Sequence, residues 1–439
     1  MTIAAHAELS TALLTDHYEL TMLQAALRSG AGHRRCVFEV FARRLPEGRR
    51  YGVVAGTGRL LDSLHAFRFD EVALAHLADA DIVDDVTLDW LRQFRFSGSM
   101  WGYAEGDCFF PGSPILVVES TFAEAVLLET VALSVLNHDC AVAAAASRMT
   151  SAAGSRPCIE MGSRRTHEQA AVAAARAAHI AGFSATSNLE AGRRYGVPTA
   201  GTSAHAFTLL HDDERSAFTA QVASLGAGTT LLVDTYDVTA GVRTAVEVAG
   251  TGLGAVRLDS GDLLTQAAQV RRQLDDLGAT GTRIIVTSDL DEYAIAALAA
   301  GPVDAYGVGT SLVTGSGAPA AGLVYKLVAR ADAAGTMVGV AKRSVGKPSI
   351  AGRKWAVRRR DRTGTAEAEV IGTGPAPSQD RDGRGLLVEL VRDGAIVGRE
   401  PLAAARERHL SARAELPPSA AQLSGGEPAI PTVFEQGRP

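Results

Sequence analysis

The sequence predicts an α/β protein built on an irregular (β/α) barrel, with an N-terminal α+β domain and a C-terminal extension of hairpins and a helix. Two observations lead to this fold class. Between about residues 120 and 330, short apolar runs end in small or acidic residues and alternate with alanine-rich helical segments. Seven such strand ends follow one another, which favours a closed or nearly closed barrel over an open sheet.

The domain boundaries follow from changes in this pattern along the 439 residues, a length that is too great for one ordinary core. We expect an N-terminal α+β domain over 1–118 and the barrel over 119–345. A C-terminal extension over 346–413 is expected to pack on the N-terminal domain, and 414–439 read as a loosely ordered tail.

The N-terminal elements have clear boundary signals. Residues 15–30 (TDHYELTMLQAALRSG) predict a capped helix that ends at Gly30, and CVFEVFARR at 36–44 predicts a strand. The apolar stretch 125–146 contains Glu129, His138 and Asp139, so it is too interrupted to span a membrane and predicts a buried helix or helix pair.

The C-terminal part alternates in the manner of antiparallel strands. Residues 355–371 and 386–398 carry turn signals at RTG and RDG, so each predicts a hairpin. A helix is expected through LAAARERHLSARAEL at 402–416.

Composition excludes some classes of protein. The formal net charge of −6 argues against a general nucleic-acid surface, because phosphate-backbone binding needs clustered Lys and Arg. The four cysteines are scattered without metal-ligand spacing, which indicates reduced and mostly buried thiols of a cytoplasmic protein. The first residues lack the charged and apolar regions of a signal peptide.

The loop after the last predicted barrel strand suggests a phosphate site. In GVGTSLVT, Gly307 and Gly309 allow close backbone approach and Thr310 adds a hydroxyl at a possible helix start. A plain glycine turn is the alternative. The late position in the barrel favours phosphate, since phosphate sites in such barrels often follow the last strands.

Acidic residues follow two other strands. Arg257 and Asp259 lie on the same side of a strand end in RLDSGDLL, where carboxylates could hold Mg²⁺ or ribose hydroxyls. The alternative is helix capping, by Ser260 or Asp262 here and by Ser288 or Asp289 in TSDLDE.

Basic residues and one histidine complete the set of strand-end candidates. Adjacent Arg164 and Arg165 in EMGSRR suit an anionic substrate, although one of them could serve a structural salt bridge. His205 stands among small residues in PTAGTSAH, which leaves room for a ligand beside its ring, whereas a hydrogen-bonded structural histidine is the other interpretation.

Ten segments in order resemble nicotinate phosphoribosyltransferase and run from about residue 11 to about residue 355. They are TDHYELTM, FEVFARRLPEGRRYGVVAG, EMGSRRTHEQA, TSNLEAGRRYGVP, GTSAHAF, VDTYD, VRLDSGDL, SDLDEY, YGVGTSLVT and KPSIAGRK.

The resemblance implies a type II phosphoribosyltransferase that is a homodimer with active sites at the subunit interface. The implied reaction joins nicotinate to 5-phosphoribosyl 1-diphosphate, giving nicotinate mononucleotide and diphosphate in NAD salvage. In the family ATP hydrolysis is coupled to this step through a phosphohistidine, with Mg²⁺ as cofactor.

Site residues carry over from the family one by one. The GTxxH segment makes His205 the phosphorylated residue, with Thr202 beside the substrates. Tyr18 would stack on the pyridine ring from the neighbouring subunit, Arg257 would face the nicotinate carboxylate, and Thr310, next to Gly309, would bind the donor phosphate. Residues expected at ribose, diphosphate or Mg²⁺ are Arg164, Asp234, Asp259 and Asp289, and those expected at ATP are Lys347 and Lys354.

One departure from the family and several alternatives bear on the substrate. Relatives often have phenylalanine where Met161 stands, which puts a two-sided aromatic sandwich on the ring in doubt, although a thioether can also lie against a ring. A nicotinamide or quinolinate phosphoribosyltransferase would share the fold. A barrel aldolase or isomerase would normally show a strand-end lysine or a Glu–His pair, and Lys326 is the sole strand-like lysine of the barrel region.

Overall fold

The computed structural model describes residues 10–342, 349–374 and 383–435. The chain forms two compact units, of which the first comprises residues 1–141 and 320–439 and the second residues 142–319. These limits differ from the predicted ones at 118 and 345. The first boundary falls inside helix α6 (Glu129–Ala153), and strand β12 (Leu323–Ala331) returns to the first unit because it pairs with β1 (Arg35–Ala42).

The first unit contains a seven-stranded antiparallel sheet with the order β13-β12-β1-β5-β3-β17-β18. Its other strands are β3 (Ser99–Tyr103), β5 (Leu116–Thr121), β13 (Met337–Gly339), β17 (Leu387–Arg392) and β18 (Ala395–Ile396). Both faces of the sheet are covered at β1. Phe38 and Val40 therefore enter a large core, while Val37 enters a smaller cluster on the other face.

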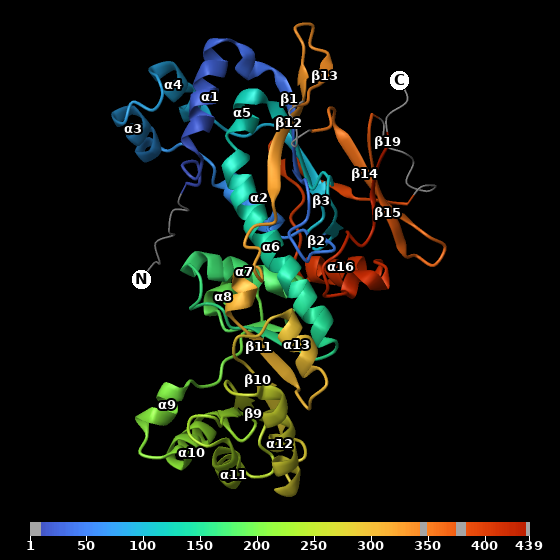
Figure 1. Ribbon diagram of the computed structural model, residues 1–439. Coiled ribbons are helices and arrows are strands. Elements are labelled where there is room, and N and C mark those ends of the chain that lie inside the picture. The colour runs from blue at the N-terminus through green and yellow to red at the C-terminus, as the bar shows by residue number, and fades with distance from the viewer. Residues whose placement is uncertain (1–9, 343–348, 375–382, 436–439) are drawn as a thin grey trace. The chain divides into compact units, whose positions relative to one another are not determined.

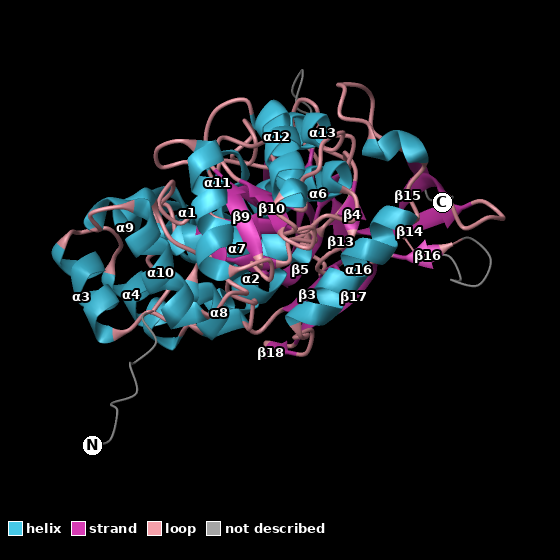
Figure 2. Ribbon diagram, turned by 90° about the horizontal axis from the view of Figure 1, so that it is seen from below, coloured by secondary structure: helices cyan, strands magenta, loops and turns pink. Residues whose placement is uncertain are grey.

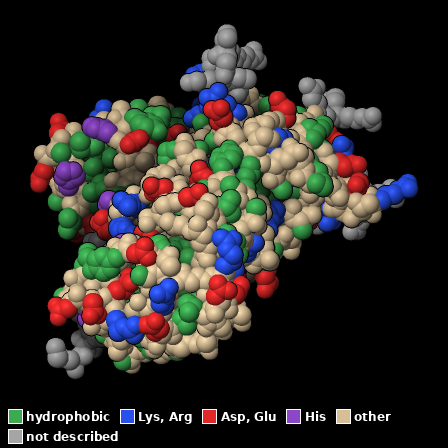
Figure 3. Space-filling model, turned by 60° about the horizontal axis from the view of Figure 1, so that its bottom comes forward, with side chains coloured by type: hydrophobic (Ala, Val, Ile, Leu, Met, Phe, Trp, Pro, Cys, Tyr) green, Lys and Arg blue, Asp and Glu red, His purple; other side chains and the backbone are tan. Residues whose placement is uncertain are grey.

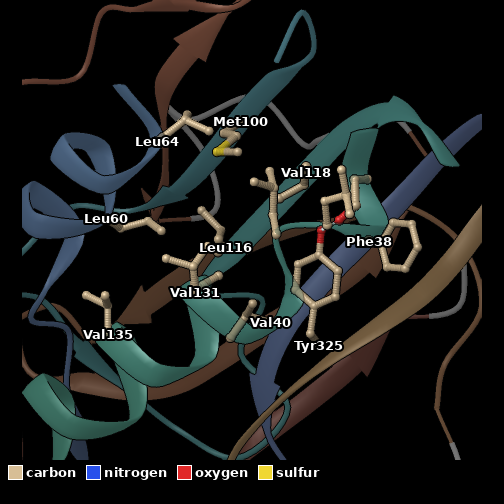
Figure 4. Packing of buried hydrophobic residues seen from close by; sticks show 14 of the residues in the cluster. Phe38, Val40, Leu60, Leu64, Met100, Leu116, Val118, Val131, Val135 and Tyr325 are labelled. Carbon is tan, nitrogen blue, oxygen red and sulfur yellow. Dashed lines mark hydrogen bonds between the residues drawn. The ribbon is translucent and has the colours of Figure 1, made fainter. Parts of the chain in front are cut away.

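Helices pack on the large-core face of this sheet. They are α1 (His17–Arg28), α2 (Thr57–His65), α3 (Glu71–Asp79), α4 (Asp85–Gln93), α5 (Phe122–Val126) and the first part of α6. Leu60 of α2 and Val131 of α6 lie against Leu116 and Val40 of the sheet (Figure 4). The predicted end of α1 is confirmed, since Gly30 has a φ of 74°, a conformation that glycine adopts without strain.

A smaller sheet of the same unit has the order β16-β14-β15-β19. Its strands are β14 (Lys354–Arg360), β15 (Ala366–Thr373), β16 (Arg384–Gly385) and β19 (Thr432–Glu435); helix α16 (Leu402–Ala414) and the pair β2 (Gly52–Val53) and β4 (Cys108–Phe109) complete the unit. The two predicted hairpins are β14–β15 and β17–β18, and β17 pairs with β3.

The C-terminal residues differ from the expected loose tail. Within 414–435 the chain forms a 3-10 turn at Pro418–Ala421 and then β19, which pairs in parallel with β15. Thr432 also donates a 2.8 Å hydrogen bond to the carbonyl of Pro111. A four-residue strand that depends on distant partners gives almost no periodic signal, so the sequence did not reveal it.

The second unit contains a parallel six-stranded sheet with the order β7-β6-β11-β10-β9-β8. Its strands are β6 (Cys158–Glu160), β7 (Ala185–Thr186), β8 (Thr230–Leu232), β9 (Ala255–Leu258), β10 (Arg283–Val286) and β11 (Ala305–Val308). The first strand, β6, pairs with the last, β11, as in a closed barrel. The circle is open between β7 and β8 within the described residues, where one bridge joins Thr186 to Thr199. The predicted irregular barrel is therefore confirmed.

Helices follow the barrel strands, as a βα repeat requires. They are α7 (Glu168–Ile180), α8 (Leu189–Tyr195), α9 (His205–Leu210), α10 (Glu214–Leu225), α11 (Val238–Ala249), α12 (Leu263–Asp276), α13 (Glu292–Leu298) and α14 (Thr310–Val313). Helices α10, α11 and α12 pack against one another in chain order (Figure 1), and α12 packs against β10 (Figure 2).

The cysteines, the helix lengths and the surface charges can be compared with what the composition predicts. All four cysteines are free and buried, as predicted. In the described part of the chain, no helix combines the length and apolarity needed to cross a membrane. Acidic and basic side chains are interspersed on the face shown in Figure 3.

Candidate active site

The carboxyl ends of the parallel strands in the second unit bring most of the predicted site residues to one edge. Asp234 follows β8, Asp259 follows β9 and Asp289 follows β10, while Gly309 and Thr310 follow β11. Parallel strands end on the same side of a sheet, which explains how residues far apart in the sequence come to share this edge.

His205 is the first residue of α9 and its side chain is 39% exposed. Its Nδ1 lies 3.1 Å from the Thr235 hydroxyl. Its Nε2 lies 3.9 Å from Oδ1 of Asp234 and 3.9 Å from Oδ2 of Asp259, which is beyond hydrogen-bond distance. One ring nitrogen is thus engaged, and the other faces two carboxylates.

Asp234 is held rigidly, because Oδ2 accepts hydrogen bonds of 2.8 Å from the Asp259 N–H and from the Ser260 hydroxyl. Its side chain is 2% exposed, and its Oδ1 is buried without a hydrogen-bond partner in the described structure. Asp259 in turn accepts a hydrogen bond from the Thr287 hydroxyl. The two carboxylates therefore keep fixed positions, with one acceptor oxygen of Asp234 unused.

Arg257 points its guanidinium toward Thr202, to whose hydroxyl Nη1 donates a 2.5 Å hydrogen bond. Its Nε is buried and has no partner among the described residues. Burial lowers the pKa of Arg257, an effect that Asp259 and Asp234 oppose and that the neighbouring Arg164 adds to. The group remains charged, and it retains an unused donor for an anionic ligand.

Strand β11 has little free volume around Gly307, its third residue. A Cβ at Gly307 would lie 2.5 Å from the Thr287 methyl and 2.8 Å from the Met161 sulfur, so only glycine fits there. Gly309 precedes the single turn α14, which starts at the exposed Thr310. The first N–H groups of a helix have no partner within it, as the phosphate interpretation requires.

Helix capping is resolved differently at the two acidic loops. Asp262 caps α12 through Thr265, as one alternative predicted, and Ser260 bonds Asp234 instead. At α13 the cap is Asp291, so the alternative interpretation of Ser288 or Asp289 as the helix cap is wrong.

Ser288 and Asp289 remain outside the helix. Ser288 has a φ of 112°, a strained conformation for a residue with a Cβ, and such strain concentrates at functional sites. The Asp289 side chain is exposed and makes no hydrogen bond to the described residues. Arg164 and Arg165 are exposed as well, at the end of β6.

Three positions were missed by sequence reasoning. Thr235 bonds the His205 ring, Thr287 bonds Asp259, and the fully buried Glu160 accepts hydrogen bonds from the Gly162 N–H and the Thr186 hydroxyl. Burial raises the pKa of Glu160. All three stand within segments whose neighbours were singled out, yet a threonine after a strand has no distinctive pattern.

Glu214, at the start of α10, adds a further carboxyl near the site. Its Oε1 is buried without a partner among the described residues. Burial, together with the charges of Asp237 and Asp234, raises the pKa of Glu214 to about 7.

Two predicted residues belong to the described part of the first unit. Tyr18 lies on α1 and is 44% exposed, and burial and the nearby Glu129 raise its pKa to about 12. Lys354 is buried and pairs with Glu39 at 2.7 Å, so its ammonium is already neutralised. Lys347 lies outside the described residues.

The fold and this edge are typical of a (β/α)-barrel enzyme. The model of the nicotinate phosphoribosyltransferase (NAPRTase) N-terminal domain matches residues 13–137, and that of the nicotinate phosphoribosyltransferase (NAPRTase) family matches 157–368. Nicotinate phosphoribosyltransferase pncB1 of Mycobacterium tuberculosis is 60% identical over 96% of this chain and 94% of its own length. The Bacillus subtilis nicotinate phosphoribosyltransferase is 39% identical over 73% of this chain and 67% of its own.

A solved structure agrees with these relatives. Human nicotinic acid phosphoribosyltransferase superposes with a TM-score of 0.81 and 25% identity, covering 96% of this chain and 97% of that one. The chain belongs to the nicotinate phosphoribosyltransferase family, and it is an enzyme.

Proposed function

We propose that this enzyme transfers the 5-phosphoribosyl group of 5-phosphoribosyl 1-diphosphate to nicotinate, giving nicotinate mononucleotide and diphosphate in NAD salvage. The observation that carries the proposal is the 60% identity to the Mycobacterium tuberculosis enzyme over 96% of the chain. The unused donor of Arg257 supports it, because a carboxylate on the pyridine ring is the substrate group that would reward a buried guanidinium.

Each strand-end residue has a role in this reaction. Arg257 would bind the nicotinate carboxylate, with Thr202 holding the guanidinium in place. Gly309 and Thr310 would receive the donor's 5-phosphate. The ribose and the diphosphate would be contacted by Asp259, Asp234 and Arg164 together.

The transfer step is mainly a matter of positioning and charge. The pyridine nitrogen forms a bond to C1 of the ribose while the bond from C1 to the diphosphate oxygen breaks, and diphosphate leaves with the electron pair. Holding the two reactants in line accounts for much of the rate, and positive groups such as Arg164 stabilise the leaving diphosphate.

Mg²⁺ fits the residues present only together with substrate oxygens. Within the described residues, no three His, Cys, Asp or Glu side chains are grouped to hold a metal on their own. The unpartnered Oδ1 of Asp234, Oδ2 of Asp259 and the exposed Asp289 would supply one or two carboxylate ligands, as Mg²⁺ bound to phosphates usually has. When bound, the ion would neutralise charge on the departing diphosphate.

ATP enters the proposal through His205. Its ring is half-exposed beside two carboxylates and small residues, where a phosphoryl group has access. Attack of a ring nitrogen on the γ-phosphorus forms the N–P bond as the bond to ADP breaks, and ADP leaves with the electron pair. A phosphorylated His205 would change substrate affinity and favour product formation.

We further propose a cytoplasmic homodimer in which Tyr18 completes the partner's site. An aromatic ring with 44% exposure on a helix is suited to stacking on a pyridine.

A product assay tests the function. The purified enzyme is incubated with 5-phosphoribosyl 1-diphosphate and with nicotinate, nicotinamide or quinolinate in turn, with and without ATP, and products are separated by chromatography. We expect nicotinate mononucleotide with nicotinate, in larger yield with ATP. A higher rate with either of the other pyridines would refute the substrate assignment.

The phosphohistidine is tested separately. Incubation with γ-labelled ATP should place acid-labile phosphate on the wild type and not on His205→Ala. Equal labelling of both proteins would move the phosphate to another residue.

A further inference from the structure

The His205 ring is bracketed by two consecutive residues of one loop. Thr235 meets Nδ1 through its hydroxyl at 3.1 Å, and Asp234 faces Nε2 with a carboxylate oxygen at 3.9 Å. Within the described residues, the hydroxyl is the only group that forms a hydrogen bond with the ring. Rotation of the imidazole about its χ2 angle would break this bond, so the hydroxyl fixes which nitrogen faces the carboxylates.

The loop that carries Thr235 is itself anchored on the neighbouring strand. The Val233 N–H donates to the carbonyl of Arg257 at 3.2 Å, and the Asp234 carboxylate is held by the Asp259 N–H and the Ser260 hydroxyl. The hydroxyl therefore occupies a position set by the barrel. A group held in this way can orient the imidazole before any substrate is bound.

A neutral imidazole carries one proton, so the partner of one nitrogen determines the reactivity of the other. When Nδ1–H donates to the Thr235 oxygen, Nε2 holds an in-plane lone pair directed toward the side of the ring where the carboxylates lie. Neither carboxylate is close enough to hydrogen-bond to Nε2, so no acceptor among the described residues holds a proton on that nitrogen.

We propose that Thr235 is a positioning residue that accepts the Nδ1–H proton of His205 and thereby makes Nε2 the atom that receives the phosphoryl group. This inference rests on the proposed phosphohistidine. In the step, the Nε2 lone pair forms the bond to the γ-phosphorus and the bond from phosphorus to ADP breaks. The ring becomes positively charged while Nδ1 keeps its proton, so the hydrogen bond to the Thr235 oxygen strengthens as the reaction proceeds.

Three substitutions separate this role from a structural one. Thr235→Val keeps the shape and removes the hydroxyl, Thr235→Ser restores a hydroxyl, and Thr239→Val makes the same change on the exposed start of α11 as a matched control. Loss of a hydrogen bond to a group that becomes charged predicts a fall in the rate of phosphorylation by labelled ATP of about 10- to 150-fold for Thr235→Val. Thr235→Ser should recover most of the rate, and Thr239→Val should match the wild type.

Nitrogen-15 NMR of histidine-labelled protein gives a readout that a purely structural role would not change. The His205 signals, assigned by their absence from His205→Ala, should report a protonated Nδ1 in the wild type and in Thr235→Ser. Thr235→Val should show a mixture of the two neutral forms. Alkaline hydrolysis of the phosphorylated protein should yield the isomer that carries phosphate on Nε2.

The outcomes are distinguishable. Phosphate on Nδ1, or wild-type phosphorylation and NMR signals in Thr235→Val, would refute the role of Thr235 and leave the phosphohistidine intact. A wild type that takes no phosphate from ATP would refute the phosphohistidine itself, and this inference with it.

Discussion

Replacing Arg257 by alanine should remove most of the preference for nicotinate over nicotinamide. In the structure one guanidinium nitrogen is bonded to Thr202, and Nε is buried with no partner among the described residues. A substrate carboxylate would therefore make a charge-assisted hydrogen bond in a partly dehydrated site. Such a bond contributes about 1.5–3 kcal/mol, which is roughly 10- to 150-fold in kcat/KM.

The ratio of kcat/KM for the two pyridines isolates this contribution. Arg257→Ala also frees Thr202 and removes a positive charge near Asp234 and Asp259, but these effects apply to both substrates and cancel in the ratio. Arg257→Lys, which keeps the charge and loses the planar fork, should fall between the wild type and alanine. Arg283→Ala, at the amino end of the neighbouring strand β10, is the matched control. An equal loss for nicotinate and nicotinamide would show that Arg257 does not bind the carboxylate.

Other predictions concern stability, pH and assembly. Glu369→Ala should lower the free energy of unfolding of the first unit by about 3–5 kcal/mol, because it removes the carboxylate 2.6 Å from the fully buried Arg358 and leaves only Asp107, at 3.9 Å, to balance the charge. A loss below about 1 kcal/mol in urea denaturation would contradict this. Glu214 binds a proton more tightly in the folded state, where its pKa is about 7, so its contribution to the stability of the fold falls as the pH rises from about 4.5 to 7. Glu214→Gln should therefore stabilise the protein more at about pH 8 than at about pH 5. Equal shifts of the melting temperature at the two pH values would refute the raised pKa. If the active sites are shared between subunits, refolding Tyr18→Ala together with His205→Ala should restore roughly a quarter of the wild-type ATP-dependent activity. About half of the dimers are then mixed, and each mixed dimer has one intact site. No recovery from dimers shown to have exchanged subunits would mean that Tyr18 serves its own subunit.

Much of the barrel could be read from local patterns. Each predicted strand end coincides with a strand or, at Thr199, with a single parallel bridge. Periodicity and end signals depend on near neighbours in the sequence, so they predict elements well. The loop residues were found for the same reason, since polar side chains after buried strands gather at one edge.

The capping assignments show where local patterns become ambiguous. TSDLDE offers several capping side chains, and the structure uses Asp291. Ser288 instead adopts a φ of 112°, which no propensity predicts. To predict which of several adjacent acidic residues caps the helix, one must know the path of the chain between the end of the strand and the start of the helix.

The order of the strand ends determined by itself an α/β protein with a parallel barrel, and the ten segments that resemble the family determined the class of enzyme. Only the tertiary structure decided that Thr235 meets the His205 ring, that Lys354 is buried against Glu39, and that β19 joins β15. Each of these contacts joins side chains or strands from separate segments of the chain. Lys354 and Glu39 are 315 residues apart in the sequence. Sequence periodicity reports which face of an element is buried, whereas the partner on that face depends on how distant segments approach one another.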